Sequence, residues 1–240
     1  MHADQPSYSK PKATEDFIYD ALYNAILERR LAPDTKLGEN LLAEHYGVSR
    51  TIVRQVLMRL SHDRLVKLQP NRGAFVASLT INEAKQIYQA WRLLEAEIVR
   101  DVTETITRKQ IAALRSLVQE ERQACDQGDL PRLTRLSAQF HMKLADLCRN
   151  QYLTRFLKEL IPQTSLAFFY EVRNMPICTK DEHSELLDCI ASGDVEKAVA
   201  AALQHLDGIE AGLNARASLN GQASLVDVLT TRVPRSASPE

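Results

Sequence analysis

Residues 37–57 read LGENLLAEHYGVSRTIVRQVL, and this stretch decides the fold of the first third of the chain. A short helix is expected from about Glu39 to Tyr46, because Gly47 suits the left-handed conformation that often ends a helix. Ser49 then opens a second helix by accepting a hydrogen bond from its first turn. Two helices joined by a tight turn of this kind are typical of a helix-turn-helix.

The second of these helices has an apolar face and a cationic face. Its apolar positions recur at helical spacing, at Val53, Val56, Leu57 and Leu60. At 100° per residue, Arg50, Thr51 and Arg54 point away from that face. An arginine placed there is suited to bind guanine O6 and N7, whereas Ser49 and Thr51 suit phosphate contacts. Residues 50–72 hold six Lys and Arg against one Asp, a net charge of +5, which favours a polyanionic partner.

The flanking residues complete this domain. Helical periodicity predicts a further helix over about 14–30. Residues 65–69 and 74–78 are strand-like and are separated by the turn residues 70–73, so we expect a two-stranded wing with Arg72 at its tip. The alternative is an ordinary three-helix bundle with a hairpin, whose arginines are merely solvated.

The composition of the whole chain favours helices. Its 240 residues include only 8 Gly and 9 Pro, which is few for the many turns of a β-sandwich. The 4 cysteines show no CxxC spacing, and we expect reduced thiols in a cytoplasmic protein. Neither a signal peptide nor an apolar run of membrane-spanning length is recognised, so no membrane partner is expected.

After the wing, the sequence predicts an all-helical bundle of about six helices without strands. Helix starts are marked by the pairs Thr80/Glu83, Thr107/Gln110, Gly128/Asp129 and Gly193/Asp194. Pro162 is expected to kink or interrupt the helix that begins near Gln151. The fold is therefore predicted to be mainly α, with a winged helix-turn-helix at 11–78, an all-helical domain at 79–216, and a flexible tail at 217–240.

Three histidines fall in the predicted helical domain: His141, His183 and His205. A lone histidine on a helix is more often an ordinary core or surface residue than a ligand. Three histidines on different helices can converge inside a bundle, where imidazole suits Zn, Ni, Fe or Mn and leaves coordination positions for water or an effector. The spacing alone leaves both interpretations open.

The stretch at 37–57 closely resembles the winged-helix signature of GntR-family bacterial transcription regulators, whose usual run ends GVSRTPVREAL. The similarity continues through Arg59-Leu60, Leu65-Val66 and the wing residues 71–73. The resemblance implies operator contacts by Arg50, Thr51, Arg54, Arg72 and Gly73, with Asn40 and Ser49 nearer the DNA backbone. Gln55 stands where Glu is common and lies close to the groove-facing side, so it is expected to alter the operator preference.

The region from about residue 82 to 216 resembles the FCD domain, the all-helical effector domain of the FadR branch of that family. The resemblance is carried by WRLLE at 91–95, by FHMKL at 140–144, by Asn150, and by Glu182-His183 with His205 further on. Many FCD domains bind a divalent metal through three histidines and an Asp four residues before the first. By that pattern His141, His183 and His205 are metal ligands.

Position 137, where that Asp is expected, is a serine. A serine hydroxyl is a poor ligand and brings no charge, which weakens metal retention and favours an anionic ligand. Two outcomes stay open: a three-histidine metal completed by water or an effector carboxylate, or a metal-free pocket whose histidines hydrogen-bond the effector.

The resemblance also implies residues that bind an effector. Arg92 corresponds to an arginine of the first FCD helix and is expected to pair with an anionic group, although an intrahelical pair with Glu95 is equally consistent with the spacing. Arg173 is a second candidate beside the aromatic run 168–170, which we assign to the core. Ser137, at the missing-ligand position, is expected to face the same effector.

Together these features predict a homodimeric repressor that binds an inverted-repeat DNA operator and responds to a small carboxylate. A metal-dependent enzyme is a second possibility; Glu182 adjoins His183 as a candidate base, but neighbours in a helix point apart. A third is a constitutive DNA-binding protein with an inert dimerisation domain.

Overall fold

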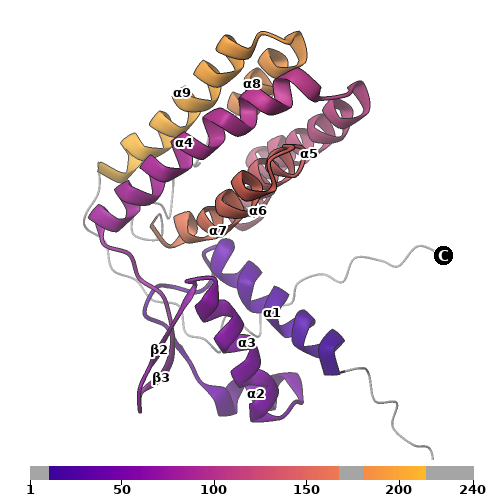
Figure 1. Ribbon diagram of the computed structural model, residues 1–240. Helices are drawn as coiled ribbons and strands as arrows, with labels where there is room; N and C mark the ends of the chain where they lie inside the picture. The colour runs from indigo at the N-terminus through magenta and orange to yellow at the C-terminus, as the bar shows by residue number, and fades with distance from the viewer. Residues whose placement is uncertain (1–10, 168–180, 215–240) are drawn as a thin grey trace, which may run out of the picture. The chain divides into compact units, whose positions relative to one another are not determined.

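The structure is a computed structural model that describes residues 11–167 and 181–214. Its elements in chain order are α1 (Pro11–Leu27), β1 (Lys36–Leu37), α2 (Glu39–Tyr46), α3 (Arg50–His62), β2 (Val66–Gln69), β3 (Gly73–Val76), α4 (Ile81–Thr105), α5 (Arg108–Asp126), α6 (Leu130–Asp146), α7 (Gln151–Ala167), α8 (Glu182–Ser192) and α9 (Val195–Asn214) (Figure 1). Among the described residues, contacts define a first unit of 11–25 and 30–77, and a second unit of 26–29 and the residues from 78 onward.

The first unit is a winged helix-turn-helix whose helix ends are set by local signals. The backbone N–H of Ile52 donates to the Ser49 hydroxyl at 3.4 Å, and Gly47 has a φ of 64°, so both predicted ends are confirmed. α3 buries the four apolar residues that its periodicity selects: Val53, Val56, Leu57 and Leu60. Its opposite face is therefore left to the cationic residues.

The wing has one strand more than predicted. β2 and β3 form the expected antiparallel pair, with Val66 opposite Val76, and β1 pairs with the other edge of β3. A strand of two residues is too short to show an alternating pattern in the sequence. In the turn between β2 and β3, Asn71 has a φ of 60° and Gly73 a φ of 100°, a conformation that glycine adopts without strain.

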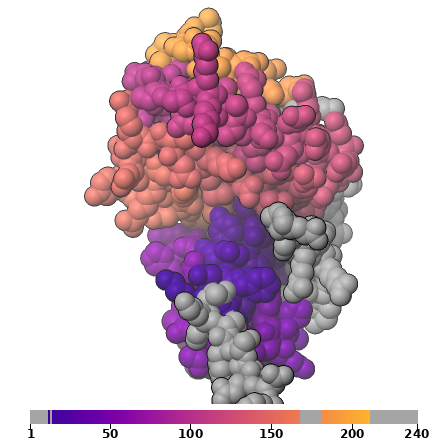
Figure 2. Space-filling model, turned by 90° about the vertical axis from the view of Figure 1, so that its right-hand side faces the viewer, coloured from indigo at the N-terminus to yellow at the C-terminus, as the bar shows by residue number. Residues whose placement is uncertain are grey.

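The second unit is a helical bundle, and no strand occurs in its described residues. α4 packs against α7 and α9, α6 packs against α5 and α7, and α8 packs against α5 and α9 (Figure 1). The capping boxes at Thr80/Glu83 and Thr107/Gln110 are both present with their two hydrogen bonds. On the face shown in Figure 2 the helices of this unit form a closely packed surface. The predicted fold class, mainly α with a winged helix-turn-helix, is confirmed.

Of the kink or interruption that the sequence predicts at Pro162, the interruption does not occur. α7 continues through Pro162 without interruption. A proline removes one intrahelical hydrogen bond, and here Leu157 and Ile161 are buried ahead of it and Leu166 after it, so tertiary packing holds the helix together on both sides.

Several predictions fall on residues outside the described ranges: the aromatic run 168–170, Arg173, Cys178 and the tail 217–240. Within the described ranges, Cys125, Cys148 and Cys189 are free cysteines. No helix there is long and apolar enough to cross a membrane.

Candidate functional site

The first candidate site is an exposed surface of the first unit. All eight residues predicted to contact DNA are exposed: Asn40, Ser49, Arg50, Thr51, Arg54, Gln55, Arg72 and Gly73. Four of them, Asn40, Arg50, Arg54 and Gly73, line a groove of about 790 Å³ that also includes Gln69 of the wing. The groove thus joins α3, the start of α2 and the wing in one concave surface.

Two arginines of this groove share one acidic partner that the sequence analysis did not single out. Arg54 Nε donates to Glu39 Oε2 at 2.8 Å, and Arg50 Nη2 donates to the same oxygen at 3.2 Å. Glu39 is the first residue of α2. Its place between the two arginines follows from the angle at which α2 and α3 pack, which the sequence does not show.

The second candidate site is a cluster of three buried histidines in the second unit. His141 lies on α6, His183 on α8 and His205 on α9, and their exposed fractions are 1%, 3% and 3%. Their Nε2 atoms face one another. The Nε2–Nε2 distance is 3.2 Å between His141 and His183, 3.1 Å between His183 and His205, and 3.3 Å between His205 and His141. The structure thus brings together the three predicted ligands.

A carboxylate holds the other ring nitrogen of each histidine. The Nδ1 atom of His141 lies 2.8 Å from Glu95, that of His183 2.7 Å from Glu121, and that of His205 2.7 Å from Glu182. An ionised carboxylate accepts hydrogen bonds and cannot donate them, so each Nδ1 carries a proton, and in a neutral imidazole the Nε2 atom then presents a lone pair. These carboxylates come from α4, α5 and α8.

The pKa shifts of two groups in the cluster agree with an ionised carboxylate and a neutral imidazole. Burial alone raises the pKa of Glu95, but His141 and the indole N–H of Trp91, which donates at 2.8 Å, outweigh it and lower the pKa. Burial lowers the pKa of His205, and the neighbouring His183 lowers it further, against the opposing effect of Glu182. Glu95 is therefore ionised and His205 neutral at pH 7.

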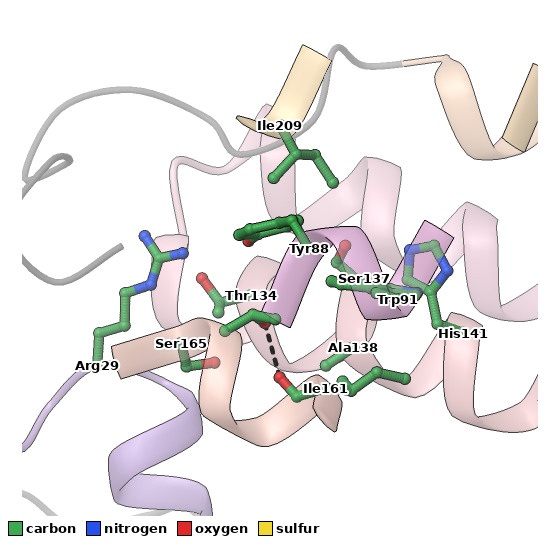
Figure 3. A pocket seen from close by; sticks show the side chains of 11 residues that line it. Arg29, Tyr88, Trp91, Thr134, Ser137, Ala138, His141, Ile161, Ser165 and Ile209 are labelled. Carbon is green, nitrogen blue, oxygen red and sulfur yellow. Dashed lines mark hydrogen bonds between the residues drawn. The ribbon is translucent and has the colours of Figure 1, made fainter. Parts of the chain in front are cut away.

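Beside the cluster lies a small cavity of about 30 Å³ (Figure 3). Its lining includes five hydroxyl side chains: Tyr88, Thr134, Ser137, Thr164 and Ser165. Arg29, which belongs to the second unit, lies at one end of the cavity, and Trp91 and His141 lie at the other (Figure 3). This space holds one or two water-sized groups, such as the two oxygens of a carboxylate.

The structure brings some of the predicted effector residues to this cavity and not others. Ser137 lines it, one helical turn before His141. Arg92 is not among the residues that line it: the guanidinium of Arg92 pairs with Asp207, at 2.7 Å, and with Glu210, both on α9. The alternative pair of Arg92 with Glu95 is not formed either, because Glu95 binds Trp91 and His141.

The charged partners in this site were not predicted as such: Arg29, Glu95, Glu121 and Glu182. Glu95 lies within the WRLLE stretch, and Glu182 adjoins His183, but nothing in the sequence shows which histidine each one faces. Glu182 indeed points away from His183 and contacts His205 instead.

A recognition helix with a wing, followed by a helical bundle with a buried polar centre, defines a winged-helix regulator with a separate C-terminal domain. Residues 14–76 match the family described as bacterial regulatory proteins, gntR family, and residues 86–208 match the FCD domain. The chain belongs to the GntR family of transcription regulators and carries an FCD domain, as the sequence predicted. It is a DNA-binding transcription regulator.

Individual relatives agree with this assignment. The chain is 24% identical to the HTH-type transcriptional repressor RspR of Escherichia coli, over 80% of this chain and 85% of the relative. It is 27% identical to the HTH-type transcriptional regulator YdhC of Bacillus subtilis, over 60% of this chain and 64% of that protein. The solved structure of E. coli McbR/YncC has the same fold, with a TM-score of 0.76, 19% identity, and coverage of 83% of this chain and 96% of that chain.

The carboxylate partners of the histidines make a testable contribution to stability. Replacing Glu95 by alanine leaves Trp91 Nε1 and His141 Nδ1 buried without their acceptor, so we expect the free energy of unfolding to fall by about 2–5 kcal/mol. Urea denaturation followed by far-UV circular dichroism measures this loss. Glu97→Ala, on the same helix, removes a carboxylate that is 60% exposed and should cost less than about 1 kcal/mol. Equal losses in both variants would contradict the prediction.

Proposed function

We propose that the protein is a homodimeric repressor that binds an inverted-repeat operator, and that a small carboxylate bound beside a divalent metal in the FCD domain controls its affinity for DNA. The observation that carries the proposal is the convergence of three Nε2 atoms within 3.1–3.3 Å of one another. Three lone pairs that face each other in a buried site repel one another unless a cation lies among them.

The histidine cluster fits a divalent cation. Ligand nitrogens that lie about 2.0–2.1 Å from a metal, with coordination angles of about 90–109°, are separated by about 3.0–3.4 Å. The separations of 3.1–3.3 Å lie within that interval. His141, His183 and His205 would hold the ion, and Zn, Ni, Fe and Mn all accept imidazole ligands. When bound, the metal would offer a Lewis-acidic position to a carboxylate.

The carboxylates that bind the histidine Nδ1 atoms supply the negative charge that the metal site was expected to lack, because position 137 is a serine. Glu95, Glu121 and Glu182 lie one hydrogen bond from the ligand atoms, where they orient the imidazoles and raise their basicity. They supply negative charge near the cation that a serine at position 137 does not. We therefore propose that metal retention does not depend on the effector.

The cavity suggests how an effector is recognised. Its lining combines the His141 edge of the cluster, five hydroxyl groups and the guanidinium of Arg29. A carboxylate that binds there would lie between the His141 side of the cluster and the guanidinium of Arg29 at the opposite end, which is its cationic partner (Figure 3). Arg92, which the resemblance implied, stays a candidate, but its two acidic partners on α9 compete with any anion.

The repressor and dimer assignments rest on the family. RspR is named a repressor, and a two-fold symmetric pair of winged helices would bind an inverted repeat. An FCD domain without a ligand would instead make the protein a constitutive DNA binder, and the effector experiment below separates that alternative from this proposal.

The operator contacts are tested by Arg54→Ala. The wild-type chain selects its preferred duplex from a random-sequence library, and both proteins are titrated with that duplex. Loss of a two-bond contact to guanine should weaken binding by about 1–3 kcal/mol. Arg59→Ala removes the same charge from the other end of α3, where Arg59 pairs with Asp16 at 2.5 Å, and should keep the sequence preference. Unchanged affinity of Arg54→Ala would remove this residue from the operator interface.

The metal is tested by elemental analysis of protein purified without added metal. We expect about one divalent ion for each wild-type chain and none for His183→Ala, which removes one of three ligands. His45→Ala, an exposed histidine of α2, is the control and should keep the metal. Negligible metal in all three proteins would favour the metal-free pocket.

The effector class is tested by a thermal-shift screen with small mono- and dicarboxylates. A ligand at a hundred times its Kd stabilises the folded protein by about 2.7 kcal/mol, which raises Tm. Arg29→Ala should lose this shift and Arg92→Ala should keep it. If no carboxylate shifts the wild-type protein, the inert-domain alternative is favoured; if only Arg92→Ala loses the shift, the role implied by the resemblance is correct.

A further inference from the structure

The two arginines that the family resemblance assigns to the operator are held by a single carboxylate oxygen. Glu39 Oε2 accepts from Arg54 Nε at 2.8 Å and from Arg50 Nη2 at 3.2 Å. The two arginine side chains are 56% and 57% exposed, whereas the side chain of Glu39 is 27% exposed. Glu39 therefore lies at the base of the groove, and the arginines extend from it toward solvent.

The contact leaves the atoms that recognise a base available. Arg54 bonds to Glu39 through Nε, and Glu39 is its one partner in the described part of the chain. Its two terminal nitrogens are then free to donate to guanine O6 and N7, which is the usual two-bond contact. A guanidinium held at Nε has a fixed plane, so less conformational freedom is lost when it binds a base.

The negative charge of Glu39 also favours contacts of the two arginines with bases over contacts with phosphates. Partial burial raises the pKa of Glu39, but the hydrogen bonds from Arg54 and Arg50 outweigh this effect and lower the pKa, so the group is ionised at neutral pH. Non-specific binding to DNA is driven by attraction of lysines and arginines to phosphates. A carboxylate between two arginines repels phosphate and so opposes non-specific contacts of both side chains.

We propose that Glu39 is a specificity-determining residue that orients Arg54 and Arg50 toward base edges and keeps them from binding phosphates. The proposal rests on the assignment of these arginines as operator contacts. It predicts that Glu39 increases the preference for the operator while decreasing the affinity for DNA in general.

The test measures binding of the full chain to two DNA probes, a duplex that the wild type selects from a random library and a mixed-sequence duplex of equal length, over a range of salt concentrations. For Glu39→Ala we expect the ratio of the two affinities to fall by about tenfold or more, the size of one lost base contact. Binding to the mixed duplex should strengthen, and its logarithmic salt slope should steepen by about 1, as for one added phosphate contact.

Two further variants separate orientation and charge from fold. Glu39→Gln keeps an acceptor oxygen but not the charge, so it should show the steeper slope and lose less of the selected-duplex affinity. Glu44→Ala removes an exposed carboxylate from the same helix and should behave as wild type.

An affinity ratio of Glu39→Ala within twofold of wild type overturns the proposal. Equal weakening on both duplexes also overturns it, because that result indicates a structural role alone. If Arg54→Ala keeps the operator preference, the assignment of the arginines is at fault; if Arg54→Ala loses it and Glu39→Ala does not, only the role of Glu39 is rejected.

Discussion

Burial of three imidazoles with their Nε2 atoms 3.1–3.3 Å apart is the constraint on which the second unit depends. Polar groups inside a helical bundle are costly unless every one has a partner. Here each Nδ1 has a carboxylate, and the indole N–H of Trp91 donates a further hydrogen bond to Glu95. The network joins five helices, α4, α5, α6, α8 and α9, through polar contacts in a centre that apolar packing alone would fill more cheaply. Such a centre is expected where a site for a ligand has to be kept.

The sequence predicted the features that depend on neighbours in the chain. The Ser49 cap and the two capping boxes join residues three positions apart, and all are present. The carboxylate partners of the histidines are distant in sequence and were not predicted. Glu95 and His141 are 46 positions apart, and Glu121 and His183 are 62 positions apart. Helical periodicity shows that a residue faces inward, but not which inward-facing residue of another helix it meets. The family resemblance identified the three histidines, whereas the carboxylates that bind them were identified only in the structure. For the same reason the sequence did not show that Arg92 pairs with Asp207, which is 115 positions away.

The two units place their functional charges in different environments, buried in the second unit and exposed in the first. The second unit gathers three carboxylates around a buried cluster, where charge is effective because water is excluded. The first unit places one carboxylate against two exposed arginines, where salt screens every interaction. A change of charge in the interior is expected to destabilise the fold, whereas one on this surface is expected to alter DNA binding. Each unit is therefore open to a different kind of mutation, and stability and operator choice are able to change separately.

The three histidines also bear on how the protein folds. His141 and His183 are 42 residues apart in sequence, and His183 and His205 are 22 apart, on three different helices. Their nitrogens meet only when α6, α8 and α9 have packed together, so the complete cluster exists only in the folded bundle. A cation that binds all three histidines would therefore stabilise the folded bundle over partly folded forms in which they lie apart. The supply of that ion would then set, through binding equilibrium, the number of folded regulators in the cell.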